Sequence, residues 1–140
     1  MESKTETPVF VYGTLKPGGY YHDTYCGGFQ FDLFEGQVKG QLYSFPSLGY
    51  PGATEHDTQS IQGVLLVFKH PEREVLSKLD ILEGYDPTRP TDQNEYYRKQ
   101  VPVFDTQDQL ICDAAWCYFM EPSKVDALNG VLIPDSYWPV

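Results

Sequence analysis

An acidic residue, Glu83, lies on the apolar side of a predicted helix. The segment 71–85, PEREVLSKLDILEGY, has a helical hydrophobic period, with a proline at its start and Gly84 where a left-handed cap would end it. At about 100° per residue, Glu83 falls inside the stripe of apolar side chains that would face the core. That stripe consists of Val75, Leu76, Leu79 and Leu82. Burial and the negative end of the helix dipole both raise the pKa of a carboxyl group, so Glu83 is a candidate general acid and base.

Two ordinary arrangements would remove this role from Glu83. The end of the helix could fray, so that Glu83 reaches solvent, or its carboxylate could pair with Arg89 or Arg98. Residue types and spacing leave these alternatives open.

A glycine-containing loop follows the first predicted strand. In the stretch VFVYGTLKPGG, from Val9 to Gly19, four apolar or aromatic residues precede Gly-Thr-Leu-Lys-Pro-Gly-Gly. Glycine lets a backbone turn sharply or approach a ligand closely. The stretch therefore predicts either a ligand-binding loop or an ordinary strand and turn.

A second possible chemistry involves Cys26 and His22, which are four residues apart and would share one face of a short helix. A thiol beside an imidazole can act as a nucleophile, although a free cysteine is more often a small buried hydrophobic residue. The other two histidines have no metal-ligand spacing, and the sequence contains no phosphate-loop or dinucleotide-binding motif. We therefore expect neither a metal nor another cofactor.

Aromatic residues alternate along two predicted strands. In Tyr96-Tyr97-Arg98, the first and third side chains face one side of the strand and Tyr97 faces the other. Trp116 and Tyr118 share one face of the following strand in the same way. One such aromatic face either lines a pocket or packs in the core.

The elements that must position these residues are mostly strands. We expect a short helical turn, one longer helix, and strands of mostly antiparallel connection, the last two forming a hairpin. The expected strands are 9–12, 29–45 (one bent or two short), 61–69, 95–104 and 110–120; the helical segments are 20–26 and 71–85; and the loops are 46–57 and 86–94. This order predicts an α+β fold with a small, mixed, mostly antiparallel β-barrel flanked by a few short helices.

Composition narrows the class of protein. The 140 residues suit a single domain, 1–140, in which we expect residues 1–7 to be disordered and residues 121–140 to form an aromatic strap over the body. A net charge of −10 disfavours nucleic acid and anionic membranes as partners. The three cysteines form no CxxC pair, and no apolar run is long enough to cross a membrane. We therefore expect a cytoplasmic protein with reduced thiols.

Three motifs together resemble a known family. VYGTLKPGG, LDILEGYDPTRP and EYYRKQVPVF, in this order, are similar to the gamma-glutamylcyclotransferase-like family, in its bacterial and gamma-glutamylamine-specific, AIG2-like branches. The resemblance covers roughly residues 9–119 and implies a small barrel flanked by helices. It also implies that Glu83 is the catalytic acid and base. The implied substrate-binding residues are Tyr12, Gly13, Thr14, Leu15, Tyr97 and Tyr118.

The resemblance further implies a reaction on a small gamma-glutamyl substrate. Its alpha-amine would attack its own gamma-carbonyl, closing 5-oxoproline and releasing a free amine, without a metal, cofactor or protein nucleophile. Successive N–H groups of the glycine loop would bind the substrate carboxylate or the developing oxyanion. The loop reads YGTL where the glutathione-degrading branches carry serine or other residues, so glutathione is not the expected substrate.

The sequence leaves alternatives open. The scaffold could bind a small amino-acid derivative without catalysis, or Cys26 could support a hydrolase. The leaving amine, a biosynthetic deacylating role and the oligomeric state are not determined by the sequence.

Overall fold

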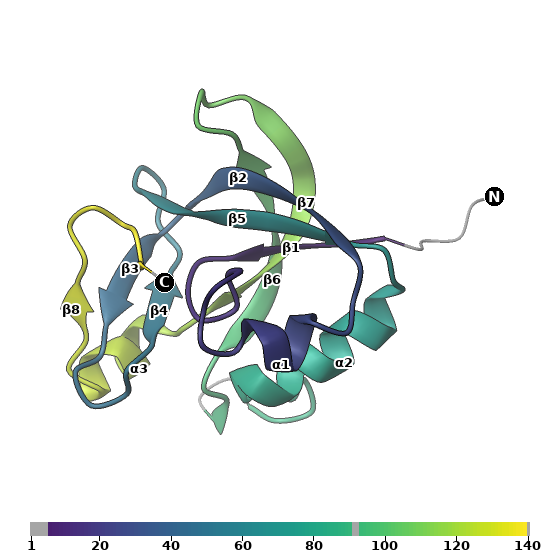
Figure 1. Cartoon of the computed structure of the whole chain (residues 1–140). Coiled ribbons are helices and arrows are strands. Elements are labelled where there is room, and N and C mark those ends of the chain that lie inside the picture. Colours follow the sequence, from purple (N-terminus) through teal and green to yellow (C-terminus); the bar gives the residue numbers. More distant parts are fainter. Residues whose placement is uncertain (1–5, 91–92, 140) are drawn as a thin grey trace.

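A closed barrel of five strands forms the body of the protein (Figure 1). The computed structural model describes residues 6–90 and 93–139. The barrel strands are β1 (Thr7–Val11), β2 (Phe31–Lys39), β5 (Ser60–Phe68), β6 (Tyr97–Phe104) and β7 (Leu110–Phe119), in the spatial order β1-β5-β2-β6-β7. Neighbouring strands are antiparallel except β1 and β7, which are parallel and close the barrel. The predicted mixed, mostly antiparallel barrel of an α+β fold is confirmed.

The parallel closure places the end of β1 beside the end of β7. Val9 pairs with Trp116, and the Tyr12 hydroxyl donates a hydrogen bond of 2.7 Å to the Tyr118 carbonyl oxygen. Because both strands run in the same direction, the loop after β1 emerges next to the last residues of β7. The predicted hairpin of β6 and β7 is also confirmed.

A second, three-stranded sheet lies beside the barrel, in the order β4-β3-β8 (Figure 1). Its strands are β3 (Gln41–Ser44), β4 (Pro51–Thr54) and β8 (Val131–Leu132). Of the two arrangements predicted for 29–45, one bent strand or two short ones, the structure has two strands, β2 and β3. The loop expected over 46–57 contains β4. The sequence of β4, PGAT, lacks the large β-favouring residues that usually mark a strand, although all four residues are buried.

The C-terminal segment is more regular than the strap we expected over 121–140. It contains the helix α3 (Pro122–Ala127) and the strand β8, which pairs with β3. The final residues do lie on the body: Gln62 donates a backbone hydrogen bond to Ser136, and Trp138 packs against the barrel interior. Helix α3 was missed because it is only six residues long and has no extended apolar period.

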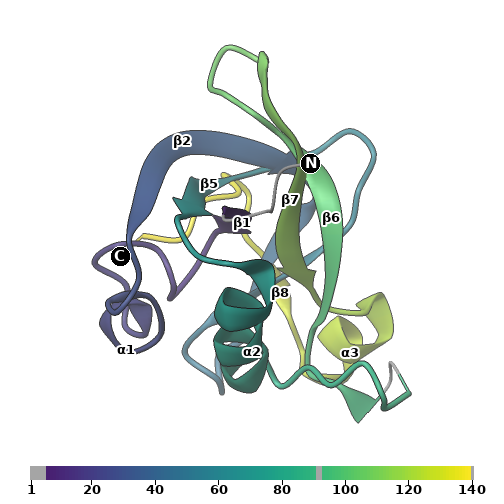
Figure 2. The same cartoon turned by 90° about the vertical axis from the view of Figure 1, so that its right-hand side faces the viewer.

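Helices α1 (His22–Cys26) and α2 (Glu72–Glu83) pack on each other and lie with α3 toward the same end of the barrel (Figure 2). The predicted stripe of α2 is confirmed for Val75, Leu76 and Leu79, which are buried. Gly84 caps the helix in the left-handed conformation, with φ of 62°. Glu83 is therefore the last residue of the helix, and the chain turns away at Gly84.

The start of the chain joins the barrel earlier than expected. Thr7, placed in the expected disordered segment 1–7, is the first residue of β1, is buried, and donates a hydrogen bond of 2.8 Å to the His70 carbonyl oxygen. Pairing of β1 with β5 orders this residue. Residues 1–5 lie outside the described part of the chain.

Candidate active site

A cavity of about 150 Å³ opens where β1 ends and α2 ends. Its volume suits a ligand of roughly amino-acid size. Its wall combines the end of β1 and the loop after it with residues of the turn before α1, of β4, of α2, of the segment just before β6, and of β7. The lining residues are Phe10, Val11, Tyr12, Gly13, Thr14, Leu15, Tyr21, Tyr50, Pro51, Leu82, Glu83, Glu95, Tyr96 and Tyr118.

Glu83 contributes a carboxyl group with a raised pKa to this cavity. Desolvation first, and then the charges of Glu95 and Asp80, raise the pKa of Glu83 to about 8. Among residues 6–90 and 93–139, no hydrogen bond or ion pair ends on its carboxylate. Arg98 pairs with Asp80 and Arg89 donates to the Gly84 carbonyl oxygen, so neither arginine takes the role of a partner for Glu83.

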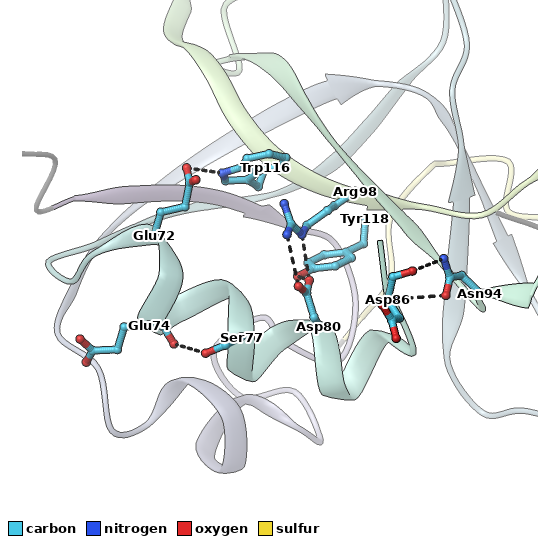
Figure 3. Close-up of polar contacts among 9 residues, drawn as sticks. All are labelled: Glu72, Glu74, Ser77, Asp80, Asp86, Asn94, Arg98, Trp116 and Tyr118. Carbon is cyan, nitrogen blue, oxygen red and sulfur yellow. Dashed lines mark hydrogen bonds and ion pairs between the residues drawn. The ribbon is translucent and has the colours of Figure 1, made fainter. Parts of the chain in front are cut away.

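A polar network holds α2 against the β6–β7 hairpin (Figure 3). Arg98 donates to both carboxylate oxygens of Asp80, at 2.9 and 3.3 Å, and the Tyr118 hydroxyl donates to the same carboxylate at 2.6 Å. The Arg98 guanidinium also lies 4.6 Å from the centre of the Trp116 ring. Asp80 precedes Glu83 by almost one helical turn, so this network fixes the part of α2 that carries Glu83.

Three backbone amides of the loop after β1 have no hydrogen-bond acceptor among the described residues. The N–H groups of Gly13, Thr14 and Leu15 donate none of the hydrogen bonds formed between described residues, although all three residues line the cavity. Such a run of N–H groups is suited to a carboxylate or an oxyanion.

The carbonyl groups of the same loop are, in contrast, occupied. Lys16 N–H donates to the Gly13 oxygen and Tyr21 N–H to the Thr14 oxygen, each at 3.0 Å. The Leu15 oxygen lies 2.8 Å from Nδ1 of His22, and because a carbonyl only accepts, this ring nitrogen carries the hydrogen. The carbonyls hold the loop in place and leave its amides for a ligand.

Tyrosines form much of the remaining wall. Burial raises the pKa of Tyr12 and of Tyr96 well above the ordinary value, so both stay neutral hydrogen-bond donors. The Tyr96 hydroxyl donates to the Pro51 carbonyl oxygen at 2.6 Å, and the Tyr50 hydroxyl donates to Glu95. These bonds connect β4 and its preceding loop to the segment just before β6.

Six of the seven site residues expected from the sequence line the cavity, and Tyr97 does not. The six are Tyr12, Gly13, Thr14, Leu15, Glu83 and Tyr118. Tyr97 instead donates to Glu55 at 2.6 Å and packs against Phe119, on the other side of the strand. Tyr96 takes its place, because Arg98 is the cross-strand partner of Tyr118 and side chains two residues apart share a face. This alternation could have identified Tyr96 from the sequence.

Other lining residues carried no signal in the sequence. Tyr50 and Pro51 stand in a segment expected to be a loop, and Glu95 is the first residue of a predicted strand. Tyr21 belongs to the turn before α1. Only the tertiary fold brings these residues to Glu83.

The alternative of a Cys26 nucleophile is contradicted by the structure. Cys26 is fully buried and does not line the cavity, and burial raises the pKa of its thiol to about 12. It therefore remains a protonated thiol at neutral pH. His22 binds the Leu15 carbonyl oxygen and thus supports the loop.

In the described ranges 6–90 and 93–139, no group of three histidine, cysteine or acidic residues gathers as a metal site. None of the helices in these ranges has the length and apolar character needed to cross a membrane.

The chain belongs to the gamma-glutamyl cyclotransferase, AIG2-like family, whose model matches residues 9–140. The match includes the C-terminal segment, which extends beyond the three motifs of the sequence. Membership indicates an enzyme of the gamma-glutamyl cyclotransferase type. A search of curated protein sequences gave no match.

Solved structures support the same fold. YkqA from Bacillus subtilis has a TM-score of 0.62 at 22% identity, with 95% of this chain and 39% of YkqA covered, so this chain spans about two fifths of that protein. An AIG2-like protein from Mus musculus has a TM-score of 0.59 at 20% identity, covering 84% of this chain and 78% of that one. A structure described as gamma-glutamyl cyclotransferase has a TM-score of 0.58 at 15% identity, covering 83% and 67%. At these identities the likeness shows the fold alone.

Proposed function

We propose that this protein cyclises a gamma-glutamyl amine or peptide to 5-oxoproline and a free amine, with Glu83 as general acid and base. The observation that carries the proposal is a carboxyl group with a pKa of about 8, without a hydrogen-bonding partner among the described residues, in the same cavity as three unpaired amides. Family membership supports the reaction type.

The loop amides bind the anionic part of the substrate. Gly13, Thr14 and Leu15 offer N–H groups to the substrate's alpha-carboxylate or to the oxygen of its gamma-carbonyl, which becomes negative when the carbonyl is attacked. Because these amides are already held by the bonds of the loop carbonyls, they need no reorganisation during the reaction.

Glu83 exchanges a proton with the substrate amine. The alpha-amino group has an ordinary pKa of about 7.7–8.0, close to that of Glu83. Transfer of a proton from the amine to Glu83 therefore changes the free energy only slightly. The reactive complex holds a neutral amine beside a protonated Glu83.

Cyclisation then needs no external reactant. The amine nitrogen forms a bond to the gamma-carbonyl carbon. The protonated Glu83 donates its proton to the departing nitrogen, and the carboxylate so formed takes up the proton that the attacking nitrogen loses. The amide bond to the leaving amine breaks when the departing nitrogen is protonated. The atoms of the substrate are divided between 5-oxoproline and the amine, and Glu83 returns to its starting state. Intramolecular attack supplies proximity.

The test measures 5-oxoproline release from gamma-glutamyl amines, gamma-glutamyl dipeptides and glutathione. Glu83→Gln should lower turnover roughly 10²- to 10⁴-fold, the range for loss of general acid–base catalysis, and circular dichroism should show an intact fold. Glu74→Gln is the matched control, since Glu74 lies exposed on the same helix. Undiminished turnover by Glu83→Gln would refute the role of Glu83. Substrate binding by the wild type without any product would instead support a non-catalytic binding protein.

A further inference from the structure

His22 begins α1, which follows the loop after β1 along the chain (Figure 1). Of the four successive carbonyl groups from Gly13 to Lys16, three accept hydrogen bonds from backbone N–H groups. The Leu15 carbonyl differs, because its partner in the described ranges is a side chain, Nδ1 of His22, at 2.8 Å. Every residue except proline supplies a backbone donor, whereas this bond needs a particular side chain at position 22. The conformation of the loop therefore depends on the identity of one residue of α1.

The bond from His22 acts on the cavity wall through two planar peptide groups. In a trans peptide the C=O and the N–H point in opposite directions, so a bond that fixes one also fixes the other. The Leu15 carbonyl shares its peptide group with the Lys16 N–H, which donates to the Gly13 carbonyl oxygen at 3.0 Å. The Gly13 carbonyl shares its own peptide group with the Thr14 N–H, which has no acceptor among the described residues. His22 therefore orients an amide that it does not contact.

His22 is itself held in place by backbone and ring contacts. Its backbone N–H donates to the Gly19 carbonyl oxygen at 3.2 Å, and its ring meets the Phe31 ring edge-on, with 5.5 Å between the centroids. His22 is 8% exposed and Leu15 is 4% exposed. Loss of the donor would therefore leave the carbonyl of a buried residue without its partner, which is costly.

The same bond limits what His22 can do directly. The Leu15 oxygen only accepts, so Nδ1 carries a hydrogen, and His22 is not among the residues that line the cavity. Cys26, one helical turn further along α1, is fully buried and does not line the cavity either. The imidazole therefore acts on a bound substrate only through the loop.

We infer that His22 is a positioning residue of the active site, whose Nδ1–H holds residues 13–16 in the conformation that orients the Thr14 N–H for the substrate. This inference rests on the proposed function, in which that amide binds the substrate. It adds a residue that lies outside the cavity, and it gives α1 a role in the reaction.

The test compares two substitutions of similar shape. Asparagine carries its amide nitrogen on Cγ, as histidine carries Nδ1, and can donate to the Leu15 carbonyl, whereas leucine has the same branching without a donor. His22→Leu should lower kcat/KM for 5-oxoproline release roughly ten- to hundredfold, because small displacements of a binding group are that costly. His22→Asn should stay within about threefold of wild type. A residue that only fills space would not be rescued by asparagine and lost with leucine.

Hydrogen exchange gives a second readout, which needs no turnover. The N–H groups of Lys16 and Tyr21 donate to the Gly13 and Thr14 carbonyl oxygens, so a loosened loop should exchange these two amides faster. Both should exchange faster in His22→Leu and at the wild-type rate in His22→Asn.

The matched control is Cys26→Ala, which removes buried volume from the same face of α1 and leaves the bond of His22 in place. It should change neither the exchange of Lys16 and Tyr21 nor kcat/KM. A His22→Asn protein as impaired as His22→Leu would overturn the inference, and so would wild-type exchange and kcat/KM in His22→Leu.

Nitrogen-15 NMR of the wild-type imidazole tests the inference even where His22→Leu does not fold. The Nδ1 atom of His22 should carry a hydrogen, and a neutral ring with its hydrogen on Nε2 would overturn the inference. Absence of 5-oxoproline from every substrate with wild-type protein would instead overturn the proposed function, while the exchange rates and the ring spectrum would still decide whether His22 holds the loop. The two failures are thus distinguishable.

Discussion

Gly13 and Pro51 lie so close together that a Cβ atom on Gly13 would come within 2.7 Å of Pro51 Cγ. The contact joins the loop after β1 to the first residue of β4, whose carbonyl oxygen also accepts the Tyr96 hydroxyl. Glycine is thus required here for close approach, since its φ is not in the left-handed region. The position of the loop amides depends on this contact.

Gly13→Ala should therefore impair both the fold and the site. Displacement of Pro51 or of the loop should lower the free energy of unfolding by about 1–3 kcal/mol and reduce kcat/KM for 5-oxoproline release. Urea unfolding and steady-state kinetics measure the two effects. Gly28→Ala is the matched control, because a Cβ at Gly28 meets no atom within 4 Å and its φ is not left-handed. A Gly13→Ala protein as stable and active as Gly28→Ala would contradict the argument.

Local patterns in the sequence predicted the parts of the site that belong to single elements. The helical period placed Glu83 on the buried stripe of α2, and the strand followed by glycine placed Gly13 in a loop at the end of β1. Both depend on side-chain periodicity and on backbone freedom, which act within a few residues.

Contacts between distant segments were not predictable in this way. Tyr50 and Glu95 meet because the β4 segment joins the second sheet, and PGAT does not resemble a strand until β3 pairs with it. The prediction that Tyr97 lines the site was wrong, because Tyr96 and not Tyr97 lies on the face of the strand that borders the cavity. The register of β6 on β7 pairs Arg98 with Tyr118 and so decides which tyrosine faces Glu83.

Glu83→Gln should stabilise the fold at neutral and alkaline pH. The folded protein keeps the Glu83 proton up to about pH 8, whereas an unfolded glutamate releases it near its ordinary value of 4.5. Between these values the folded state binds more protons, so the contribution of Glu83 to stability falls as pH rises. Glutamine has no proton to lose. The stability difference between variant and wild type should grow from near zero at pH 4.5 to roughly 2–4 kcal/mol above pH 8.

Urea unfolding at pH 4.5, 6, 7 and 8.5 measures this difference. Subtracting the wild-type free energy of unfolding from that of the variant removes the contribution of all other titrating groups. Glu35→Gln, at an exposed position of β2, should show no such trend. A constant difference across this range would mean that the pKa of Glu83 is not raised in the folded state.

The pH dependence of kcat/KM should be bell-shaped, with its maximum near pH 8. The productive complex carries one exchangeable proton on Glu83 and the substrate amine together, and both groups have pKa values near 8. Below about pH 7 both are protonated, so kcat/KM should fall roughly tenfold per unit. Well above pH 8 both have lost their protons and the rate should fall again. A profile that stays flat from pH 6 to 8 would exclude the proposed proton exchange.

Asp80→Asn should move the acidic limb of that profile to lower pH. The charge of Asp80 raises the pKa of Glu83, so its removal, which also leaves the Arg98 cation unpaired, lowers that pKa. The same change breaks a partly buried ion pair and should reduce stability by about 3–5 kcal/mol. Measurement of kcat/KM against pH at 15 °C separates the shift of the acidic limb from the loss of stability. Loss of stability with an unchanged acidic limb would indicate that Asp80 only supports the fold.

Lys16→Met should loosen the C-terminal segment and, through it, the substrate-binding loop. Lys16 directly follows Leu15, is only 4% exposed, and donates from its Nζ to the Trp138 carbonyl oxygen while lying 4.2 Å from the centre of the Tyr137 ring. Methionine keeps the apolar stem but removes the donor and the charge, so stability should fall by about 1–3 kcal/mol and KM should rise more than kcat falls. Hydrogen exchange should become faster at both Ser136–Trp138 and Thr14–Leu15. Lys39→Met, at an exposed residue of β2, is the control and should change neither region. Faster exchange confined to Ser136–Trp138, with KM unchanged, would show that the segment covers the barrel without positioning the loop.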